Sequence, residues 1–333
     1  MTMVTMAQAA RRVERLLDIL KEIGAKPASL EGVEAGALSL WEILERLSVP
    51  GDPEDPETVE LYVTGAGIHD LAAKISAVWE QRPDAQPALE PHLHALAKTA
   101  YVAQNATNPR WDRKGPLARE HGSADKVIEL YWGCLCLLAG MRAIEMDDPA
   151  ASSGGKNPDV IATAADGTRW AFAIKTLAET KAANVPKNLT DRLDEALEQI
   201  ERAECDRGIA VINLKNVLDH NALRSGHAYA NTMSASSALS RQLLAPLTAF
   251  YDVEASRLEP RFEKRSKLVP IAALVAHATV LMLPPSSHKH TFTQIKSMVG
   301  FAIPTLAGSG PGTYRAEGEA LLHDLNDVVQ RAL

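Results

Sequence analysis

The sequence is poor in cysteine and aromatic residues and carries no excess of positive charge. Its three cysteines, Cys134, Cys136 and Cys205, are too few for a disulfide framework. Cys134 and Cys136 lie two apart in a predicted helix and point in different directions, which predicts buried thiols in a reducing compartment and no zinc site. With 42 acidic and 35 basic residues, the net charge is -7. This balance excludes a generally basic nucleic-acid binder, so contact with DNA or RNA requires a local basic patch.

Targeting and membrane signals are also missing. No basic and apolar signal peptide opens the chain, and no apolar run is long enough to span a membrane. The longest apolar run, residues 268–283, contains Pro270 and His277, which favours a buried strand or helix. The glycine-rich residues 305–313 lack the residue order of a phosphate-binding P-loop. We therefore expect a cytoplasmic protein without membrane contact.

The hydrophobic residues that are present follow helical spacing in the first third of the chain. Over the whole chain, hydrophobic residues make up 46% of the 333 residues, enough to fill the core of two domains or of one large α/β domain. Helices are predicted at residues 1–24, 38–47, 59–81 and 90–104. We expect a helical N-terminal region over residues 1–115, which would recognise a substrate, a protein partner or a second subunit, and an α/β domain over residues 116–333.

Residues 154–176 carry the clearest chemical signal. Two apolar runs are joined by AADGT, and Asp-Gly between strand-like runs predicts a hairpin. Because side chains alternate along a strand, Trp170, Phe172 and Ile174 should share one face, and Ala171, Ala173 and Lys175 the other. Hairpin pairing would bring Asp159, at the start of the first strand, near Lys175. A carboxylate beside a lysine suits metal-assisted phosphoryl or hydrolytic chemistry.

The segments around the hairpin have a regular order. A helix is predicted at residues 123–140 and a strand at 141–147, followed after the hairpin by a helix at 189–203 and a strand at 207–214. Further along, we predict a polar loop at 220–240, a helix at 239–258, strands at 268–283 and 300–306, and a final helix at 316–333.

Glu129 is the only charged residue in the apolar stretch VIELYWGCLCLL of the predicted helix. A buried lone carboxylate is costly, so Glu129 should be paired or bind a metal. The alternative is a glutamate that faces solvent at a gap in the apolar face.

The hairpin residues resemble the motif of the PD-(D/E)XK nuclease superfamily. Pro158-Asp159 matches the family's PD, and Ala173-Ile174-Lys175 stands where its (D/E)XK tripeptide belongs, at a spacing that the family commonly uses. The order helix, strand, hairpin, helix, strand also matches the core of the superfamily, which carries an acidic residue at the helical position of Glu129. The resemblance implies an α/β fold with a restriction-endonuclease-like mixed central sheet flanked by helices, here preceded by the helical region.

Roles for individual residues follow from this resemblance. It implies Mg²⁺ or Mn²⁺ held by Asp159, the acid at position 173 and the backbone carbonyl of Ile174, with Glu129 assisting. Lys175 would orient or activate the attacking water and stabilise charge in the transition state. The implied reaction is hydrolysis of a nucleic-acid phosphodiester, in DNA rather than RNA, and a role in antiphage defence would fit by analogy.

The chain departs from the family at Ala173, where a glutamate or aspartate is expected. A methyl group cannot bind a metal, so we expect the chain to be inactive. Either an acid was replaced deliberately, which the otherwise intact motif favours, or the site is naturally degenerate. A third possibility is that Asp147 or Glu145 supplies the missing carboxylate.

Two basic stretches are candidates for phosphate contact, although a linker and a solvated loop are the alternatives. They contain Arg110, Arg113 and Lys114 near Trp111, and Arg261, Lys264 and Arg265. Histidines give only weak metal signals. His92 and His94 lie two apart instead of four, and the cluster His288, Lys289, His290 and Lys296 lacks a carboxylate or cysteine.

Three functions therefore remain in view. The first is a metal-dependent endonuclease, inactive in this chain. The second is a non-catalytic module that binds nucleic acid or assembles with a partner and retains the nuclease fold. The third is a helical interaction protein whose hairpin matches the motif by chance. Restoring an acid at position 173 separates them, because only the first should regain cleavage.

Overall fold

The computed structural model describes residues 4–26, 32–47, 55–99, 122–150, 157–177, 184–224, 228–254, 260, 267–283, 291–302 and 312–331. Its N-terminal part is helical, as predicted. It contains α1 (Met6–Glu22), α2 (Val33–Leu47), α3 (Pro56–Gln81), a short 3-10 turn (Pro83–Ala85) and α4 (Gln86–Ala97). Thr5 and Gln8 form a capping box at the start of α1, and the side chain of Asp55 accepts a hydrogen bond from the backbone of Thr58 at the start of α3.

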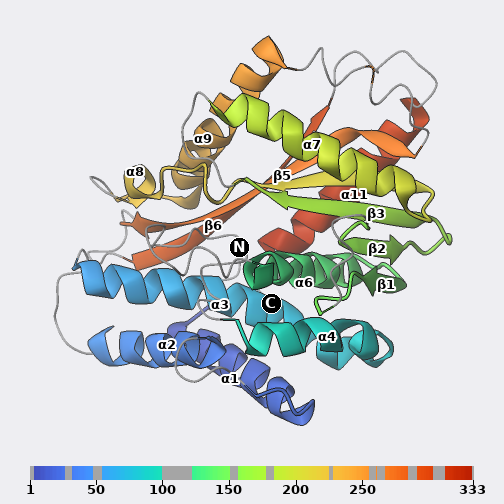
Figure 1. Ribbon diagram of the computed structural model, residues 1–333. Coiled ribbons are helices and arrows are strands. Elements are labelled where there is room, and N and C mark those ends of the chain that lie inside the picture. Colours follow the sequence, from blue (N-terminus) through green and yellow to red (C-terminus); the bar gives the residue numbers. More distant parts are fainter. Residues whose placement is uncertain are drawn as a thin grey trace.

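A six-stranded mixed sheet follows the helical region (Figure 1). The strands lie side by side in chain order: β1 (Ala143–Met146), β2 (Val160–Thr163), β3 (Arg169–Thr176), β4 (Arg207–Asn213), β5 (Leu268–Met282) and β6 (Thr291–Ala302). β1, β2 and β3 pair antiparallel, β3, β4 and β5 pair parallel, and β6 pairs antiparallel with β5. The predicted α/β class with a mixed sheet is therefore confirmed.

Helices cover both faces of the sheet (Figure 1). α6 (Gly122–Leu138) and α11 (Gly312–Gln330) pack on one face, on the side of the N-terminal helices, and α7 (Val185–Arg202) and α9 (Thr232–Val253) pack on the other. One apolar core runs from α1 through α6 to the sheet and α11. The residues around the predicted boundary at 115 lie outside the described part, and the division into two regions stays a prediction.

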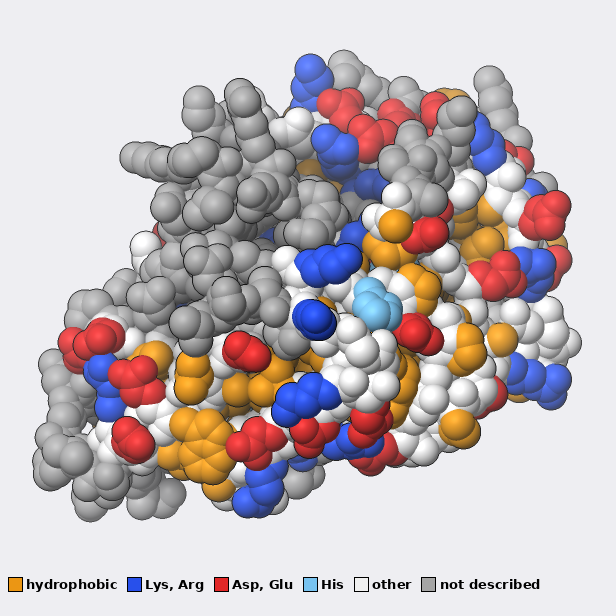
Figure 2. Space-filling view, turned by 60° about the horizontal axis from the view of Figure 1, so that its bottom comes forward, with side chains coloured by type: hydrophobic (Ala, Val, Ile, Leu, Met, Phe, Trp, Pro, Cys, Tyr) orange, Lys and Arg blue, Asp and Glu red, His pale blue; other side chains and the backbone are white. Residues whose placement is uncertain are grey.

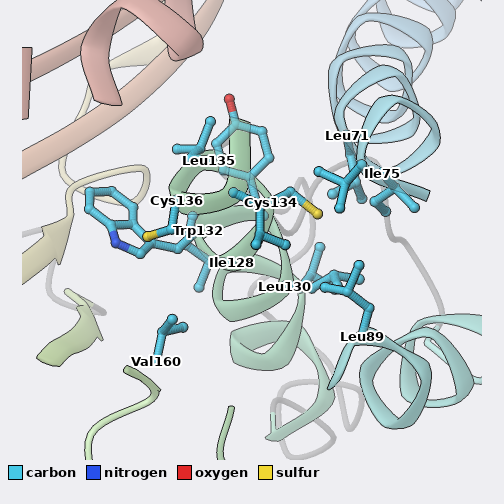
Figure 3. Packing of buried hydrophobic residues seen from close by; sticks show 14 of the residues in the cluster. Leu71, Ile75, Leu89, Ile128, Leu130, Trp132, Cys134, Leu135, Cys136 and Val160 are labelled. Carbon is cyan, nitrogen blue, oxygen red and sulfur yellow. The ribbon is translucent and has the colours of Figure 1, made fainter. Parts of the chain in front are cut away.

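The apolar face of α6 lies at the centre of this core. Figure 3 shows Cys134 and Cys136 among side chains of α3, α4 and α6. Both thiols are fully buried, and burial raises the pKa of Cys134 to about 12. The prediction of buried thiols is therefore confirmed. Within the described residues, no helix is long and apolar enough to cross a membrane.

The hairpin forms as the sequence predicts. Its turn closes through a hydrogen bond from the backbone N–H of Ala164 to the carbonyl oxygen of Thr168, and Gly167 adopts a φ of 94°. That positive φ is the conformation for which the Asp-Gly pair is suited. Register pairs Val160 with Phe172, and the β3 side chains separate into the two predicted faces, with Phe172 in one core and Ala173 in the other.

Two predictions about the last third of the chain were wrong. Residues 220–240 are not one polar loop, since they contain α8 (His220–Arg224) and the start of α9. The buried residues of α9 include Ala235, Leu239 and Leu243, and Asn231 caps the helix. The polar serines between these apolar residues made the segment resemble a loop. The late strand also begins at residue 291 and not at 300, because β6 pairs with β5 along its whole length. Pairing with β5, and not the local amino-acid composition, therefore determines where β6 begins.

Candidate active site

The structure brings Asp159, Lys175 and Glu129 together where β2 begins and β3 ends. Asp159 directly precedes β2, Lys175 is the penultimate residue of β3, and Glu129 lies in the middle of α6. β3 runs parallel to β4, so the site lies at the carboxyl end of parallel strands, where α/β proteins commonly place functional groups.

Asp159 is held by the backbone of β3. One carboxylate oxygen, Oδ2, accepts a hydrogen bond from the backbone N–H of Ile174 over 2.6 Å, and Nζ of Lys175 lies 3.8 Å from the same oxygen. The residue is only 8% exposed. Burial raises the pKa of Asp159 to about 7, and the charge of Glu129 adds to this effect while Lys175 opposes it. The proximity of Asp159 and Lys175, predicted from hairpin pairing, is confirmed.

Glu129 is buried and paired. It is 4% exposed, so a solvent-facing glutamate was the wrong alternative. Its Oε2 lies 2.7 Å from Nζ of Lys126 on the same helix and 3.4 Å from Nε2 of His92 on α4. Neither Lys126 nor His92 was predicted to lie at this site.

His92 is the residue that sequence reasoning missed here. It is 2% exposed and lies in the buried stripe of α4 with Leu89, Leu93 and Leu96. Burial lowers the pKa of His92 to about 4, so the ring is neutral at pH 7. A carboxylate only accepts hydrogen bonds, so the single ring proton belongs on Nε2. Nδ1 then has no hydrogen-bond partner among the described residues. The sequence feature that could have identified His92 is its position in line with the apolar residues of a predicted helix.

His94 lies apart from this group. It is half-buried, and its Nε2 is 3.7 Å from Glu90 on the same helix. The expectation that His92 and His94 do not share one helix face therefore agrees with the structure.

Position 173 lies beside Asp159 on the neighbouring strand. The pairing of Val160 with Phe172, together with a hydrogen bond from the Asp159 N–H to the Phe172 carbonyl, places residue 173 next to Asp159. Ala173 is fully buried on the face covered by α7. An acid at this position would share a face with Lys175, two residues further along the strand.

As written, the chain does not offer a complete metal-binding set. No three His, Cys, Asp or Glu side chains among the described residues are placed to share a metal ion. Asp159 and Glu129 supply two carboxylates, and lysines already pair with both, while Ala173 stands at the position predicted for a further acidic ligand. The present donors therefore do not fit a divalent ion, and the predicted role of the Ile174 carbonyl stays a prediction.

Neither suggested replacement carboxylate completes this set. Glu145 is exposed, and Arg169 donates two hydrogen bonds to its carboxylate over 2.8 and 3.0 Å. Asp147 lies nearer, since its backbone N–H donates to the Asp159 carbonyl oxygen, but its Oδ1 accepts a hydrogen bond from Asn157 over 3.3 Å. The structure therefore does not support Glu145 or Asp147 as a replacement for the acid that is missing at position 173.

Two of the predicted groups fall outside the described residues. These are Arg110, Arg113 and Lys114, and Arg261, Lys264 and Arg265. His288, Lys289 and His290 also fall outside, while Lys296 lies on β6 and forms an ion pair with the buried Asp70. The second metal site suggested around Lys296 therefore gains no support.

A second buried polar cluster surrounds Asp70 on α3. Its Oδ1 accepts from Lys296 and from Lys74, the latter over 2.6 Å, and its Oδ2 accepts from the hydroxyl of Tyr131 on α6 over 2.7 Å. The cluster ties α3 to α6 and to the sheet. Lys74 is fully buried and Asp70 nearly so, and their contacts help to hold these elements together.

Comparison of the chain with protein-family models, with curated proteins and with solved structures gave no match.

Proposed function

We propose that this chain has the scaffold of a PD-(D/E)XK-type nuclease that hydrolyses DNA phosphodiesters, and that Ala173 disables it. The observation that carries the proposal is the convergence of Asp159, Lys175 and Glu129 at one edge of the sheet. Their separation in the sequence makes this convergence a property of the fold. Together with the PD and xxK residues and the order of elements, it supports nuclease chemistry more than a chance match.

The proposed roles use the charges that the site already holds. Asp159 is fixed by the Ile174 N–H, and Lys175 lies close enough to orient a water or to stabilise negative charge on a phosphate. A divalent ion, Mg²⁺ or Mn²⁺, would polarise the phosphate and activate the water, but it needs the acid that this chain lacks. The preference for DNA and the role in defence rest on analogy with the family.

One observation favours the second candidate, a non-catalytic module for nucleic-acid binding or assembly. Lys175 and Lys126 stand beside the two carboxylates, so the site is balanced in charge without a metal. The helical region offers a surface for such assembly. Figure 2 shows acidic, basic and hydrophobic side chains interspersed on its outer face, and Leu38 and Trp41 of α2 are exposed. A protein partner or second subunit there stays a prediction.

Cleavage of supercoiled plasmid and of single-stranded DNA, with Mg²⁺ or Mn²⁺, tests the proposal. We expect no cleavage by the chain as written, cleavage by Ala173→Glu, and loss of that cleavage when Lys175→Ala is added. Ala173→Gln is the matched control, because it adds the same bulk at a buried position without a charge. If Glu and Gln variants fold equally well and neither cuts nor binds Mn²⁺, catalysis is excluded and the binding module takes its place.

A further inference from the structure

Two residues of the N-terminal helices lie at the edge of the buried cluster around Asp70. Arg12 of α1 donates a hydrogen bond from Nη1 to Nε2 of His69 on α3 over 2.6 Å. His69 directly precedes Asp70, and the charge of Asp70 acts on both Arg12 and His69. Because Nε2 accepts this bond, the ring is neutral and its proton lies on Nδ1. Burial lowers the pKa of His69 to about 4, which agrees with a neutral ring at pH 7.

Positive charges outnumber negative charges in this cluster. Asp70 is the carboxylate that its basic groups share in the described part of the chain. Burial raises the pKa of Asp70, but the charges of Lys296 and Lys74 lower it far below its ordinary value, so Asp70 is ionised. Burial lowers the pKa of Lys74 to about 8, and this lysine stays mainly charged at pH 7. With Arg12, which no protein environment deprotonates, the cluster has an excess of two positive charges.

The other polar groups of the cluster do not remove this excess. Tyr131 and His277 are neutral at pH 7, because burial raises the pKa of the phenol and lowers that of the imidazole to about 3. The carbonyl oxygen of Val329, near the C-terminal end of α11, accepts a hydrogen bond from Lys296 over 2.9 Å. A helix C-terminus supplies only about half a negative charge. Buried charge that no counter-ion compensates is costly, so the cluster favours a further negative group.

The N–H groups that are open to such a group belong to Arg12 and His69. Among the described residues, the guanidinium of Arg12 uses one of its five N–H groups, in the contact with His69, and Nδ1–H of His69 has no partner. Neither side chain contributes an atom to the polar groups that are buried without a partner, so these N–H groups reach solvent. Arg15, three residues further along α1, instead pairs with Glu22 and Glu80.

We propose that Arg12 and His69 form an anion-binding site, to which Lys296 and Lys74 add positive charge, and that its ligand is a phosphate dianion. A guanidinium can bind two phosphate oxygens at once. A phosphate monoester carries about 1.5–2 negative charges at pH 7, which matches the excess, whereas each phosphodiester of DNA carries one. The site shares no residue with the proposed active site, so the inference is independent of the proposed function.

Titration of the full chain at pH 7 and constant ionic strength tests the proposal. The probes are inorganic phosphate, adenosine 5′-monophosphate and a DNA oligonucleotide without a terminal phosphate, followed by nitrogen NMR of the arginine and histidine side chains. We expect the first two probes to shift the signals of Arg12 and His69 and to bind more tightly than the oligonucleotide. Tighter binding of the nucleotide than of inorganic phosphate would identify a phosphate monoester as the ligand, and the reverse would identify free phosphate.

Arg12→Gln should lower the affinity for inorganic phosphate about 10- to 100-fold, because it removes a charged, two-pronged hydrogen-bond donor. Arg11→Gln is the matched control. Arg11 is the preceding residue of α1 and is exposed, so its replacement removes the same charge from the same helix and should leave the affinity unchanged. Arg12→Lys keeps the charge without the fork and should lower the affinity less than Arg12→Gln, which keeps the test available if Arg12→Gln does not fold.

Three results would overturn the inference. Millimolar phosphate that leaves the Arg12 and His69 signals in place would show that water alone solvates these groups. Equal loss of affinity in Arg12→Gln and Arg11→Gln would show attraction by general positive charge and no site. Tighter binding of the oligonucleotide than of both phosphate probes would replace the dianion with the backbone of a nucleic acid.

Discussion

The carboxylate of Asp159 accepts a hydrogen bond from the backbone N–H of Ile174 over 2.6 Å, inside a site from which water is largely excluded. This single bond fixes the side chain against β3. It does not offset the cost of burying a negative charge, since burial still raises the pKa of Asp159 to about 7. Burying the Asp159 carboxylate therefore lowers the stability of the folded protein wherever that group is ionised.

Asp159→Asn should stabilise the protein at high pH. The folded pKa lies above the ordinary value of 3.8, so between about pH 4 and pH 7 the folded protein holds a proton that the unfolded chain has released. The contribution of Asp159 to the free energy of unfolding is thus largest below pH 4 and is lost as the pH rises to about 7. Asparagine cannot ionise. We expect the asparagine variant to be more stable than the original by about 1–2 kcal/mol at pH 8, and to keep only a smaller part of that advantage at pH 5.

Urea unfolding at the two pH values checks this. An advantage that is equal at pH 5 and pH 8 would show that the carboxylate does not titrate in this window. Asp84→Asn serves as the control, because Asp84 is exposed and lies away from the site in a salt bridge with Arg82.

Lys175→Met should have the opposite pH dependence. Methionine keeps most of the apolar stem but removes the positive charge that lowers the pKa of Asp159. The carboxylate is then harder to ionise, so the variant should lose about 1–2 kcal/mol at pH 8 and little at pH 5, where Asp159 is protonated. The pH at which Asp159 titrates, followed by carbon NMR of its carboxyl group, should move upward. If it does not move, the 3.8 Å contact has no electrostatic effect.

The site could be predicted from the sequence as far as local patterns extend. Asp166-Gly167 and the apolar alternation fix the hairpin, and its register then brings Asp159 to Lys175. Glu129 was found because one charge in an apolar helix needs a partner. The role of His92 as a partner of Glu129 was not predicted, because the two residues are 37 positions apart and their contact depends on how α4 packs against α6. No spacing within either helix encodes that contact.

The same limit explains the rest of the fold. Asp70 and Lys74 stand four apart in an apolar helix, a local signal for a buried pair. Their third partner, Lys296, lies 226 positions from Asp70, on a strand whose position is set by β5. Sequence patterns identified elements and faces, while contacts between distant elements depended on packing that no local pattern specifies.

Removing Asp70 should destabilise the protein severely. Its carboxylate accepts hydrogen bonds from Lys74, Lys296 and Tyr131 at the junction of α3, α6 and β6. Asp70→Ala leaves two lysines without their shared counter-ion, and we expect a loss of about 3–5 kcal/mol in the free energy of unfolding. Adding Lys74→Met and Lys296→Met removes the uncompensated charges and should recover part of that loss. No recovery would mean that the carboxylate contributes through packing alone.

Gly208→Ala should disturb the packing of α7 against the sheet. A Cβ atom at position 208, on β4, would come 2.1 Å from Cγ2 of Ile200 on α7, far inside van der Waals contact. The helix must shift or the isoleucine must change rotamer, and overpacking of this kind costs about 1–3 kcal/mol. Because β4 lies beside β3, that shift would also disturb the strand that carries Lys175. Ile200→Ala removes the obstructing atom, so Gly208→Ala should cost less in that background than alone when both are measured by urea unfolding. If Gly208→Ala costs the same free energy of unfolding in both backgrounds, the side chain of Ile200 is not the obstacle to the added methyl group. The close approach of α7 to β4 would then not be what positions this part of the sheet.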